Sequence, residues 1–165
     1  DIQIEAVINA DAGNSVAIAA GSGWNSATLA NITPIANILN AKRLIPEDNY
    51  DIYDGTGYLV LSPKDYEFLI GNSQVIQNPT YKRDITSTGS VEEIAGLKII
   101  VSNVVTVSQA YVVKAKEALT WKQVQPLVVK TIEDPGIKTT IRAYQLGVAQ
   151  SPNINAMCKI TGTQD

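Results

Sequence analysis

The chain has 165 residues, of which 45% are hydrophobic and 18% charged, with a formal net charge of −3 and no histidine. A chain of this length and composition can bury a substantial core, so it is not disordered, and its single cysteine excludes a fold held by internal disulfides. The basic residues are scattered singly, which argues against direct binding to a phosphate backbone, and no apolar run approaches the roughly eighteen residues of a membrane span.

The first 32 residues predict little regular structure. The sequence begins at Asp1, without a methionine, a basic segment or an apolar leader, so we expect a processed product or a piece of a longer protein. Residues 1–12 have apolar side chains at loosely helical spacing and predict a weak helix. Residues 13–27 are small and polar, which indicates a connection with one short strand at Val16–Ala19.

A helix is predicted to begin at Thr33-Pro34, because threonine can cap free amide groups and proline fits the first turn of a helix. It should end near Leu44, because Pro46 disfavours helical geometry at the residue before it. A polar loop should follow over residues 47–57. The predicted buried side chains of this helix are Ile35, Ile38 and Leu39.

The next unit is an apolar strand that runs directly into a capped helix. Tyr58–Leu61 is uninterrupted, as is typical of a strand covered on both faces in the middle of a sheet. Ser62 is the predicted helix cap, and Asp65 suits the positive end of the helix. The helix should stop at Gly71-Asn72. Its predicted buried face is Tyr66, Leu69 and Ile70.

The second half of the chain is rich in predicted strands. Residues 72–90 are polar and turn-rich and predict a long surface loop. A tight hairpin should turn at Ala95-Gly96, and a long one at residues 133–136. Strands that outnumber helices without regular alternation indicate an α+β fold. The predicted strands are 91–94, 97–101, 110–114, 118–121, 127–132, 137–146 and 156–161.

The sequence offers no catalytic group that we can identify. Histidine is the usual general base and the commonest zinc ligand, and its absence also removes Ser-His and Cys-His nucleophile pairs. Cys158 lies in an apolar strand and is interpreted as core. An enzyme that used carboxylates alone would need two facing acids, whereas the acids here lie mostly in predicted loops. We therefore expect no enzyme, cofactor or metal.

Three weak patterns have both a functional and a structural interpretation. Gly21-Ser22-Gly23 is similar to the start of a dinucleotide fingerprint, but the third glycine is missing and a loop is favoured. The aspartates at 48, 51 and 54 do not have the spacing of a helix-loop-helix calcium site, so a solvated loop is favoured. Trp24 and Trp121 suit an interface or a sugar site, although core packing is favoured.

The order of short motifs resembles that of the major capsid proteins of tailed phages and related archaeal viruses. In that family a helix and a Val-Pro step lead to a strand ending in Ser-Pro, then to a hairpin with a conserved Ser-Asn end. The corresponding segments here are Leu44-Ile45-Pro46, Ser62-Pro63, and the run Gly-Ser-Val-Glu-Glu-Ile-Ala-Gly-Leu-Lys-Ile-Ile-Val-Ser-Asn over 89–103. The stretch from Gly147-Val148 through Pro152 to Ile160 is also similar.

The resemblance implies a Hong Kong 97-like fold, with a central mixed sheet flanked by helices and a projecting hairpin. Residues 1–32 would be the end of a spine helix and a connecting loop, residues 33–125 an axial domain, residues 126–152 a peripheral hairpin, and residues 153–165 a C-terminal strand. The family's N-terminal arm and extended loop have no counterpart in the sequence. The hairpin tip, where neighbouring capsomers would meet, is Glu133, Asp134, Pro135 and Gly136.

The function implied by the resemblance is that of a structural subunit of a viral icosahedral shell, located in the virion. Its partners would be copies of itself, enclosing nucleic acid without sequence-specific binding, with no membrane and no small-molecule substrate. Two alternatives are an encapsulin-type compartment subunit and a carbohydrate-binding or adhesion module that uses Trp24 and Trp121. A two-sheet sandwich would contradict the capsid interpretation.

Overall fold

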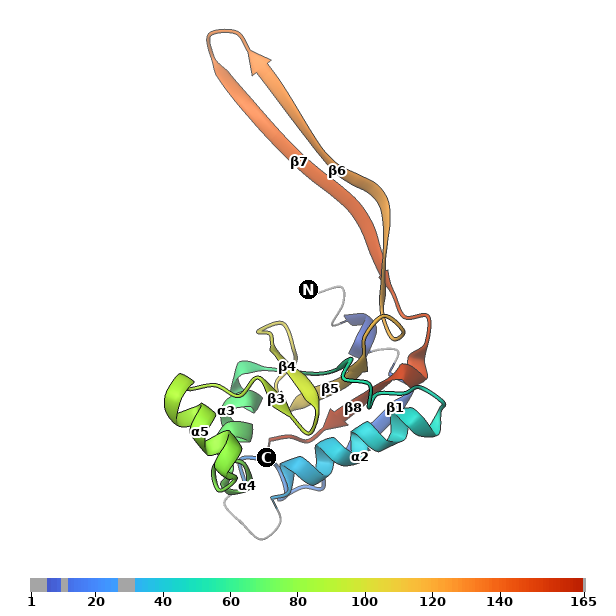
Figure 1. Ribbon diagram of the computed structural model, residues 1–165. Coiled ribbons are helices and arrows are strands. Elements are labelled where there is room, and N and C mark those ends of the chain that lie inside the picture. The colour runs from blue at the N-terminus through green and yellow to red at the C-terminus, as the bar shows by residue number, and fades with distance from the viewer. Residues whose placement is uncertain (1–5, 10–11, 27–31, 165) are drawn as a thin grey trace.

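The computed structural model describes residues 6–9, 12–26 and 32–164 (Figure 1). It is a body built on one mixed sheet, from which a long two-stranded ribbon projects. The helices are α2 (Pro34–Glu47), α3 (Pro63–Gly71), α4 (Ser73–Ile76), α5 (Pro79–Thr88) and the 3₁₀ turn η2 (Ile154–Ala156). The strands are β1 (Asn14–Ala17), β2 (Gly57–Leu61), β3 (Glu93–Ile94), β4 (Leu97–Val101), β5 (Gln109–Lys114), β6 (Thr120–Asp134), β7 (Lys138–Gln150) and β8 (Met157–Thr161).

The body sheet has the order β1-β8-β5-β2-β4-β3 and combines parallel with antiparallel neighbours. β2 pairs in parallel with β4 and antiparallel with β5, so the strand predicted for the middle of the sheet is an interior strand. Its burial alternates, however. Leu59 and Leu61 are fully buried, whereas Tyr58 and Val60 are only partly buried. The prediction of complete cover on both faces is therefore wrong, because α2 packs on one face, whereas Tyr58 and Val60 line an open groove on the other.

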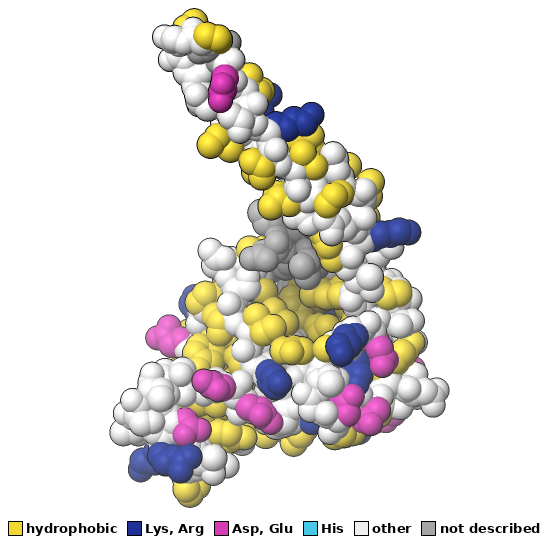
Figure 2. Space-filling view, turned by 45° about the horizontal axis from the view of Figure 1, so that its top comes forward, with side chains coloured by type: hydrophobic (Ala, Val, Ile, Leu, Met, Phe, Trp, Pro, Cys, Tyr) yellow, Lys and Arg dark blue, Asp and Glu magenta, His cyan; other side chains and the backbone are white. Residues whose placement is uncertain are grey.

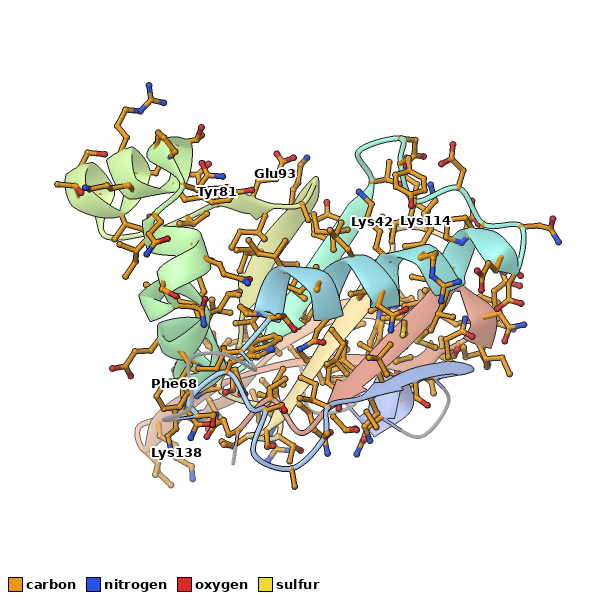
Figure 3. All side chains as sticks on the ribbon, turned by 90° about the horizontal axis from the view of Figure 1, so that it is seen from below. Lys42, Phe68, Tyr81, Glu93, Lys114 and Lys138 are labelled. Atoms are coloured by element: carbon orange, nitrogen blue, oxygen red, sulfur yellow. The ribbon has the colours of Figure 1, made fainter. Side chains whose placement is uncertain are left out.

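The main core lies between that face and the helices. Leu59 is in register with Val112 of β5, which is in register with Cys158 of β8, and all three are fully buried. Helix α2 lies across these strands and adds Ile38 and Ile45 to the same cluster (Figure 3). Burying each such side chain contributes about 1.5–3 kcal/mol, so this layer is a main source of stability.

Helix α2 differs from its prediction in its buried face and in its end. Leu39 is 48% exposed, and Ala41 and Lys42 are buried in its place. The Lys42 ammonium group donates to the Ala95 carbonyl at 2.8 Å and lies 4.6 Å from the centre of the Tyr53 ring. The long lysine stem therefore packs like an apolar side chain while its charge reaches a carbonyl and an aromatic face.

The helix also continues through Pro46 to Glu47, three residues beyond the predicted end at Leu44. A proline in the last turn removes only one amide donor, and the chain then closes with hydrogen bonds from the Asp48 amide to Ile45 and from the Asn49 amide to Pro46. The prediction assumed that a helix ends before a proline, whereas a proline in the last turn of a helix is tolerated.

Helix α3 follows its prediction closely. The Ser62 hydroxyl accepts from the Asp65 amide, Pro63 occupies the first turn, and Leu69 is fully buried. Tyr66 packs at the core edge, and its hydroxyl accepts a 2.7 Å hydrogen bond from the Val91 amide. α3 is thereby tied to the segment before β3.

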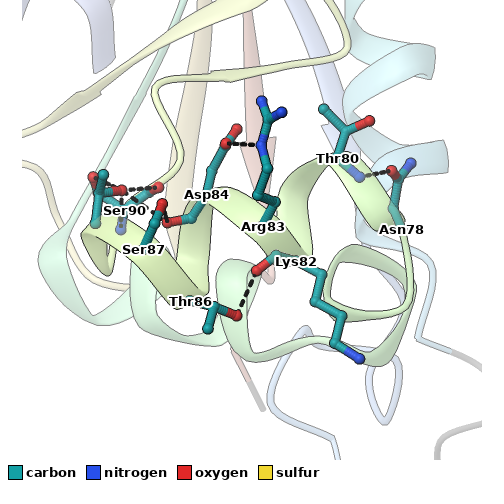
Figure 4. Close-up of polar contacts among 9 residues, drawn as sticks. Asn78, Thr80, Lys82, Arg83, Asp84, Thr86, Ser87 and Ser90 are labelled. Atoms are coloured by element: carbon teal, nitrogen blue, oxygen red, sulfur yellow. Dashed lines mark hydrogen bonds and ion pairs between the residues drawn. The ribbon is translucent and has the colours of Figure 1, made fainter.

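The predicted surface loop at 72–90 is wrong, because this segment forms α4 and α5 (Figure 4). Each helix begins at an asparagine whose side chain accepts from the backbone two residues on, Asn72 from Gln74 and Asn78 from Thr80. Gly89 ends α5 in the left-handed conformation, at φ 72°. α5 has no fully buried residue, and its apolar stripe is limited to Tyr81 and Ile85, which pack at the edge of the main core, although its capping signals are complete.

At the N-terminus, β1 covers residues 14–17 instead of the predicted 16–19, and it pairs in parallel with β8, with Val16 opposite Ile160. Residues 6–9 form a helical turn, while residues 1–5 and 10–11 of the predicted helix lie outside the described residues. The hairpin of β3 and β4 turns at Ala95 and Gly96, as predicted. Both residues have a positive φ.

The predicted strand 127–132 and residues 120–121 of the predicted strand 118–121 belong to one strand, β6, which pairs antiparallel with β7 along its whole length. The register shifts between Gln123 and Gln125, and again between Gln125 and Val128. Pro126 lies inside the second irregularity, where its missing amide donor is tolerated. Because of this proline and its polar neighbours, the sequence predicted two strands where the structure has one.

Candidate assembly surface

The ribbon of β6 and β7 exposes far more apolar surface than a free two-stranded ribbon normally does. It extends away from the body, and apolar side chains cover much of its visible surface (Figures 1 and 2). An isolated two-stranded ribbon is marginally stable at best in water, and large exposed apolar patches mark interaction sites. The large apolar side chains exposed on it are Trp121, Val124, Leu127, Val129, Ile132, Ile137, Ile141, Tyr144, Leu146 and Val148.

The register divides the outer half of the ribbon into two faces. Directly opposite residues share a face, and successive pairs alternate between faces. We call the face with Lys130 opposite Arg142 the basic face, and the face with Glu133 opposite Thr139 the acidic face. The basic face also contains the pairs Val128–Tyr144, Ile132–Thr140 and, at the tip, Asp134–Lys138. The acidic face also contains the pairs Val129–Ala143 and Thr131–Ile141.

The four predicted subunit-contact residues lie together at the tip of the ribbon. Glu133 and Asp134 are the last residues of β6, and Pro135 and Gly136 form the turn, with Gly136 at φ 81°. The sequence reading missed their neighbour Ile137, which is 81% exposed. An isoleucine directly after a Pro-Gly turn predicts that the tip of the hairpin is apolar. The contact role of the four residues stays a prediction.

The two tryptophans have different environments. Trp24 is 2% exposed and belongs to the main core, as the favoured interpretation predicted. Trp121 is 48% exposed and lies against Gly147 on the neighbouring strand, where an added Cβ would come within 2.4 Å of the indole ring. Glycine at 147 thus makes room for the ring at the base of the ribbon. Since Trp24 is enclosed, the pair cannot form a shared sugar platform.

A second apolar feature is a groove of about 450 Å³ on the sheet face opposite α2. Figure 2 shows it as a hollow of apolar side chains below the ribbon. Its floor consists of alternate residues of β2 and β5, which accounts for the partial exposure of Val60 and Tyr58. The groove is also lined by Ile8, Ile100, Val104, Val105, Tyr111, Val113 and Leu119.

The predicted acidic loop forms separate polar contacts. Asp48 accepts from the Asn14 side-chain amide at 2.8 Å, and Asp51 accepts from the Tyr53 amide at 2.9 Å. Asp54 accepts from the ammonium group of Lys114, which is buried. Over the described residues, no group of three acidic or cysteine side chains lies close enough to hold a metal ion. The three aspartates therefore act as local caps and ion-pair partners.

Acid should weaken the fold through Asp54. Hydrogen bonds from Lys114 and then Thr56 hold the pKa of its carboxyl well below the ordinary value of 3.8. A carboxyl whose pKa falls on folding contributes stability above its unfolded pKa, and that contribution is lost as the pH falls through the folded pKa. We expect the stability difference between wild type and Asp54→Asn to be constant above about pH 5 and to shrink below about pH 4.

Urea unfolding between pH 2.5 and pH 7 measures this difference. Asp51→Asn is the matched control, because Asp51 accepts only a local backbone bond in the same loop. An Asp54→Asn difference that is the same at pH 2.5 and at pH 7 would contradict the assignment.

Cys158 is a buried core thiol, and burial raises its pKa to about 12. The reactive thiolate is therefore scarce at neutral pH and enclosed. We expect a thiol-specific reagent such as dithionitrobenzoate to label the native protein at least ~100-fold more slowly than the protein in denaturant. Ser87→Cys in a Cys158→Ala background is the exposed control, and fast labelling of native wild type would contradict the buried placement.

The helices of the described residues are too short or too polar to cross a membrane. The structure thus presents two apolar surfaces, the ribbon and the groove, and a set of polar contacts that stabilise the body. Neither apolar surface has a partner inside the described part of the chain.

No family model matches the sequence, and no curated protein matches it significantly. Solved structures do match. The capsid of cyanophage P-SCSP1u has a TM-score of 0.72 and 16% identity over 98% of this chain. A protein of Mycobacterium phage Che8 has a TM-score of 0.68 and 15% identity over 94% of it. The virus-like particle of Pyrococcus furiosus has a TM-score of 0.61 and 15% identity over 96% of it.

The chain spans 60%, 55% and 59% of the length of those three proteins, respectively. The similarity covers nearly all of the present chain, including the mixed sheet, the helices on one face and the projecting ribbon. The chain therefore has a mixed α+β fold that is also found in phage capsid proteins.

Proposed function

We propose that the chain is the greater part of a Hong Kong 97-like major capsid protein, a structural subunit whose copies assemble into an icosahedral shell around the viral genome. The observation that carries the proposal is the exposed apolar ribbon. A monomer gains nothing from displaying ten large apolar side chains, whereas a shell subunit can bury them against its neighbours. The similarity to phage capsid structures supports the same conclusion.

We propose the following division of the chain. The sheet and helices of residues 33–125 would be the axial domain, and residues 126–152 would be the peripheral hairpin. The boundary falls at the irregularity between Gln125 and Val128, where the long ribbon changes register. Residues 1–32 would connect to the spine helix, and residues 153–165 return to the body, where β8 pairs with β5.

A structural role also fits the chemistry of the body. Asp54 and Lys114 form an ion pair, the single thiol is buried, and the net charge is slightly negative. Mild acidity on an inner surface would limit adhesion of packaged nucleic acid to the shell. The proposal therefore needs no catalytic residue, cofactor or substrate.

Electron microscopy of the purified full-length protein tests this function. Closed particles of uniform size are the expected result, and a full-length protein that stays monomeric at all concentrations would overturn the proposal. The contents of the purified particles distinguish a viral capsid from the shell of a protein compartment. Packaged nucleic acid supports a capsid, whereas a copurifying cargo enzyme and no genome would favour a compartment subunit.

A further inference from the structure

The basic face of the ribbon contains an electrostatic conflict. Lys130 and Arg142 are directly opposite each other, and side chains in such pairs have Cβ atoms only about 4.5–5.5 Å apart. Like charges in this position repel each other and destabilise the pairing. Both side chains are exposed, and neither has an ion-pair partner among the residues that the structure describes. Among the side chains that the structure describes, the pair therefore lacks a counter-charge that would relieve the repulsion.

The acidic face offers the complementary group. Glu133 is exposed, lies opposite the uncharged Thr139, and has no ion-pair partner within the described residues. Figure 2 shows basic side chains among apolar ones on the outer half of the ribbon, and an acidic side chain nearer its tip. One ribbon thus presents the Lys130–Arg142 pair on one face, with the Asp134–Lys138 pair nearer the tip, and Glu133 on the other face. Glu133 cannot meet Lys130 and Arg142 within one copy, because it lies on the opposite face.

We propose that the basic face of one ribbon packs on the acidic face of the ribbon of a second copy, with the Glu133 carboxylate between Lys130 and Arg142. The inference rests on the proposed function and specifies which surfaces meet. The guanidinium group of arginine can bind the carboxylate in a bidentate manner, and lysine supplies the second cation. Because the two faces differ, the contact is heterologous and can close into a ring of copies.

The apolar neighbours favour a protein partner. Ile132 and Tyr144 flank the cations on the basic face and are 46% and 41% exposed, while Val129 and Ile141 on the acidic face are 60% and 69% exposed. Packing the two faces together would bury these side chains around the ion pair, as in an interface with an apolar centre. A groove for nucleic acid would instead need a track of cations that follows the backbone, whereas this face has the Lys130–Arg142 pair and then Lys138 opposite an acidic residue, Asp134.

Charge exchange tests the contact. The double substitution K130E/R142E reverses one face, E133K reverses the other, and the triple substitution K130E/R142E/E133K restores complementarity with opposite signs. Sedimentation velocity over a concentration series measures self-association of the chain and does not require closed shells. K82E/R83E on α5 is the control, since it makes the same change in net charge at exposed positions on the body.

We expect K130E/R142E and E133K each to weaken self-association about tenfold at low salt, and the triple variant and the control to associate like wild type. The wild-type contact should also weaken as the ionic strength is raised from 0.01 M to 1 M. A triple variant that associates no better than K130E/R142E would overturn the inference, as would a wild-type chain without measurable self-association. Circular dichroism should show the same fold for all variants.

Two further results keep this inference separate from the proposed function. If the full-length protein forms shells and the charge exchange has no effect on association, the inference is wrong and the capsid function stands. If K130E/R142E abolishes binding of a single-stranded DNA 30-mer and leaves self-association unchanged, the basic pair serves nucleic acid, and the inference is also wrong.

Discussion

Replacing Asp65 with alanine is expected to lower the free energy of unfolding by about 3–5 kcal/mol, because three buried or part-buried donors would lose their acceptor. The carboxylate is fully buried. It accepts from the Ser62 hydroxyl at 2.6 Å, the Thr163 hydroxyl at 2.6 Å and the Gln164 side-chain amide at 2.8 Å. These bonds join the start of α3 to the segment after β8, so their loss should loosen two parts of the body.

Urea unfolding at neutral pH measures the effect. Asp65→Asn keeps one acceptor oxygen and should lose less stability than Asp65→Ala. Asp84→Ala is the matched control, since the Asp84 side chain is 41% exposed beside Arg83 on α5, and its loss should cost less than about 0.5 kcal/mol. An Asp65→Ala protein within 1 kcal/mol of wild type would show that water replaces the carboxylate at this site.

The role of Asp65 shows where sequence reading succeeds and where it stops. The sequence predicted Ser62 as the helix cap and Asp65 as a residue suited to the first turn, and the structure joins the two side chains across that turn. Thr163 and Gln164 lie nearly a hundred residues away, and no local pattern connects them to α3. Local hydrogen bonds have sequence signatures, whereas bonds between distant segments depend on the topology of the sheet.

The errors in the helices have the same origin. The helical spacing of apolar residues predicted that Leu39 of α2 is buried. The buried residue is instead Lys42, whose ammonium group contacts a carbonyl and an aromatic ring in the tertiary structure. The helix α5 has complete caps and an apolar stripe of only two residues, Tyr81 and Ile85, so a reading that required a longer stripe missed it. Here the capping residues Asn78 and Gly89 were the better signal.

The candidate site was predicted only at its tip. Pro135 and Gly136 identify a turn by their backbone preferences, and the structure has a turn there. The two faces of the ribbon depend on the register of β6 and β7, which the irregularities near Gln123 and Pro126 shift by one residue at a time. Because each shift moves side chains to the opposite face, the sequence alone does not show that Lys130 opposes Arg142.

The double substitution Val129→Asp and Ile141→Asp is expected to abolish assembly of the full-length protein and to change the stability of the body by less than about 0.5 kcal/mol. Both side chains lie on the acidic face and are 60% and 69% exposed, so the substitution removes no core contact. In an assembled shell the same positions would be buried, where an unpaired carboxylate is strongly unfavourable. Two added charges at every copy of a repeated contact would therefore prevent growth of the shell.

Electron microscopy and sedimentation measure particle formation, and urea unfolding measures the stability of the body. The conservative double substitution Val129→Ile and Ile141→Val keeps the surface apolar and should assemble like wild type. Particles formed by the aspartate variant at wild-type yield would show that this face stays in water after assembly. In that case the exposed apolar side chains of the ribbon would have no role in joining subunits, and the observation that carries the proposed function would be lost.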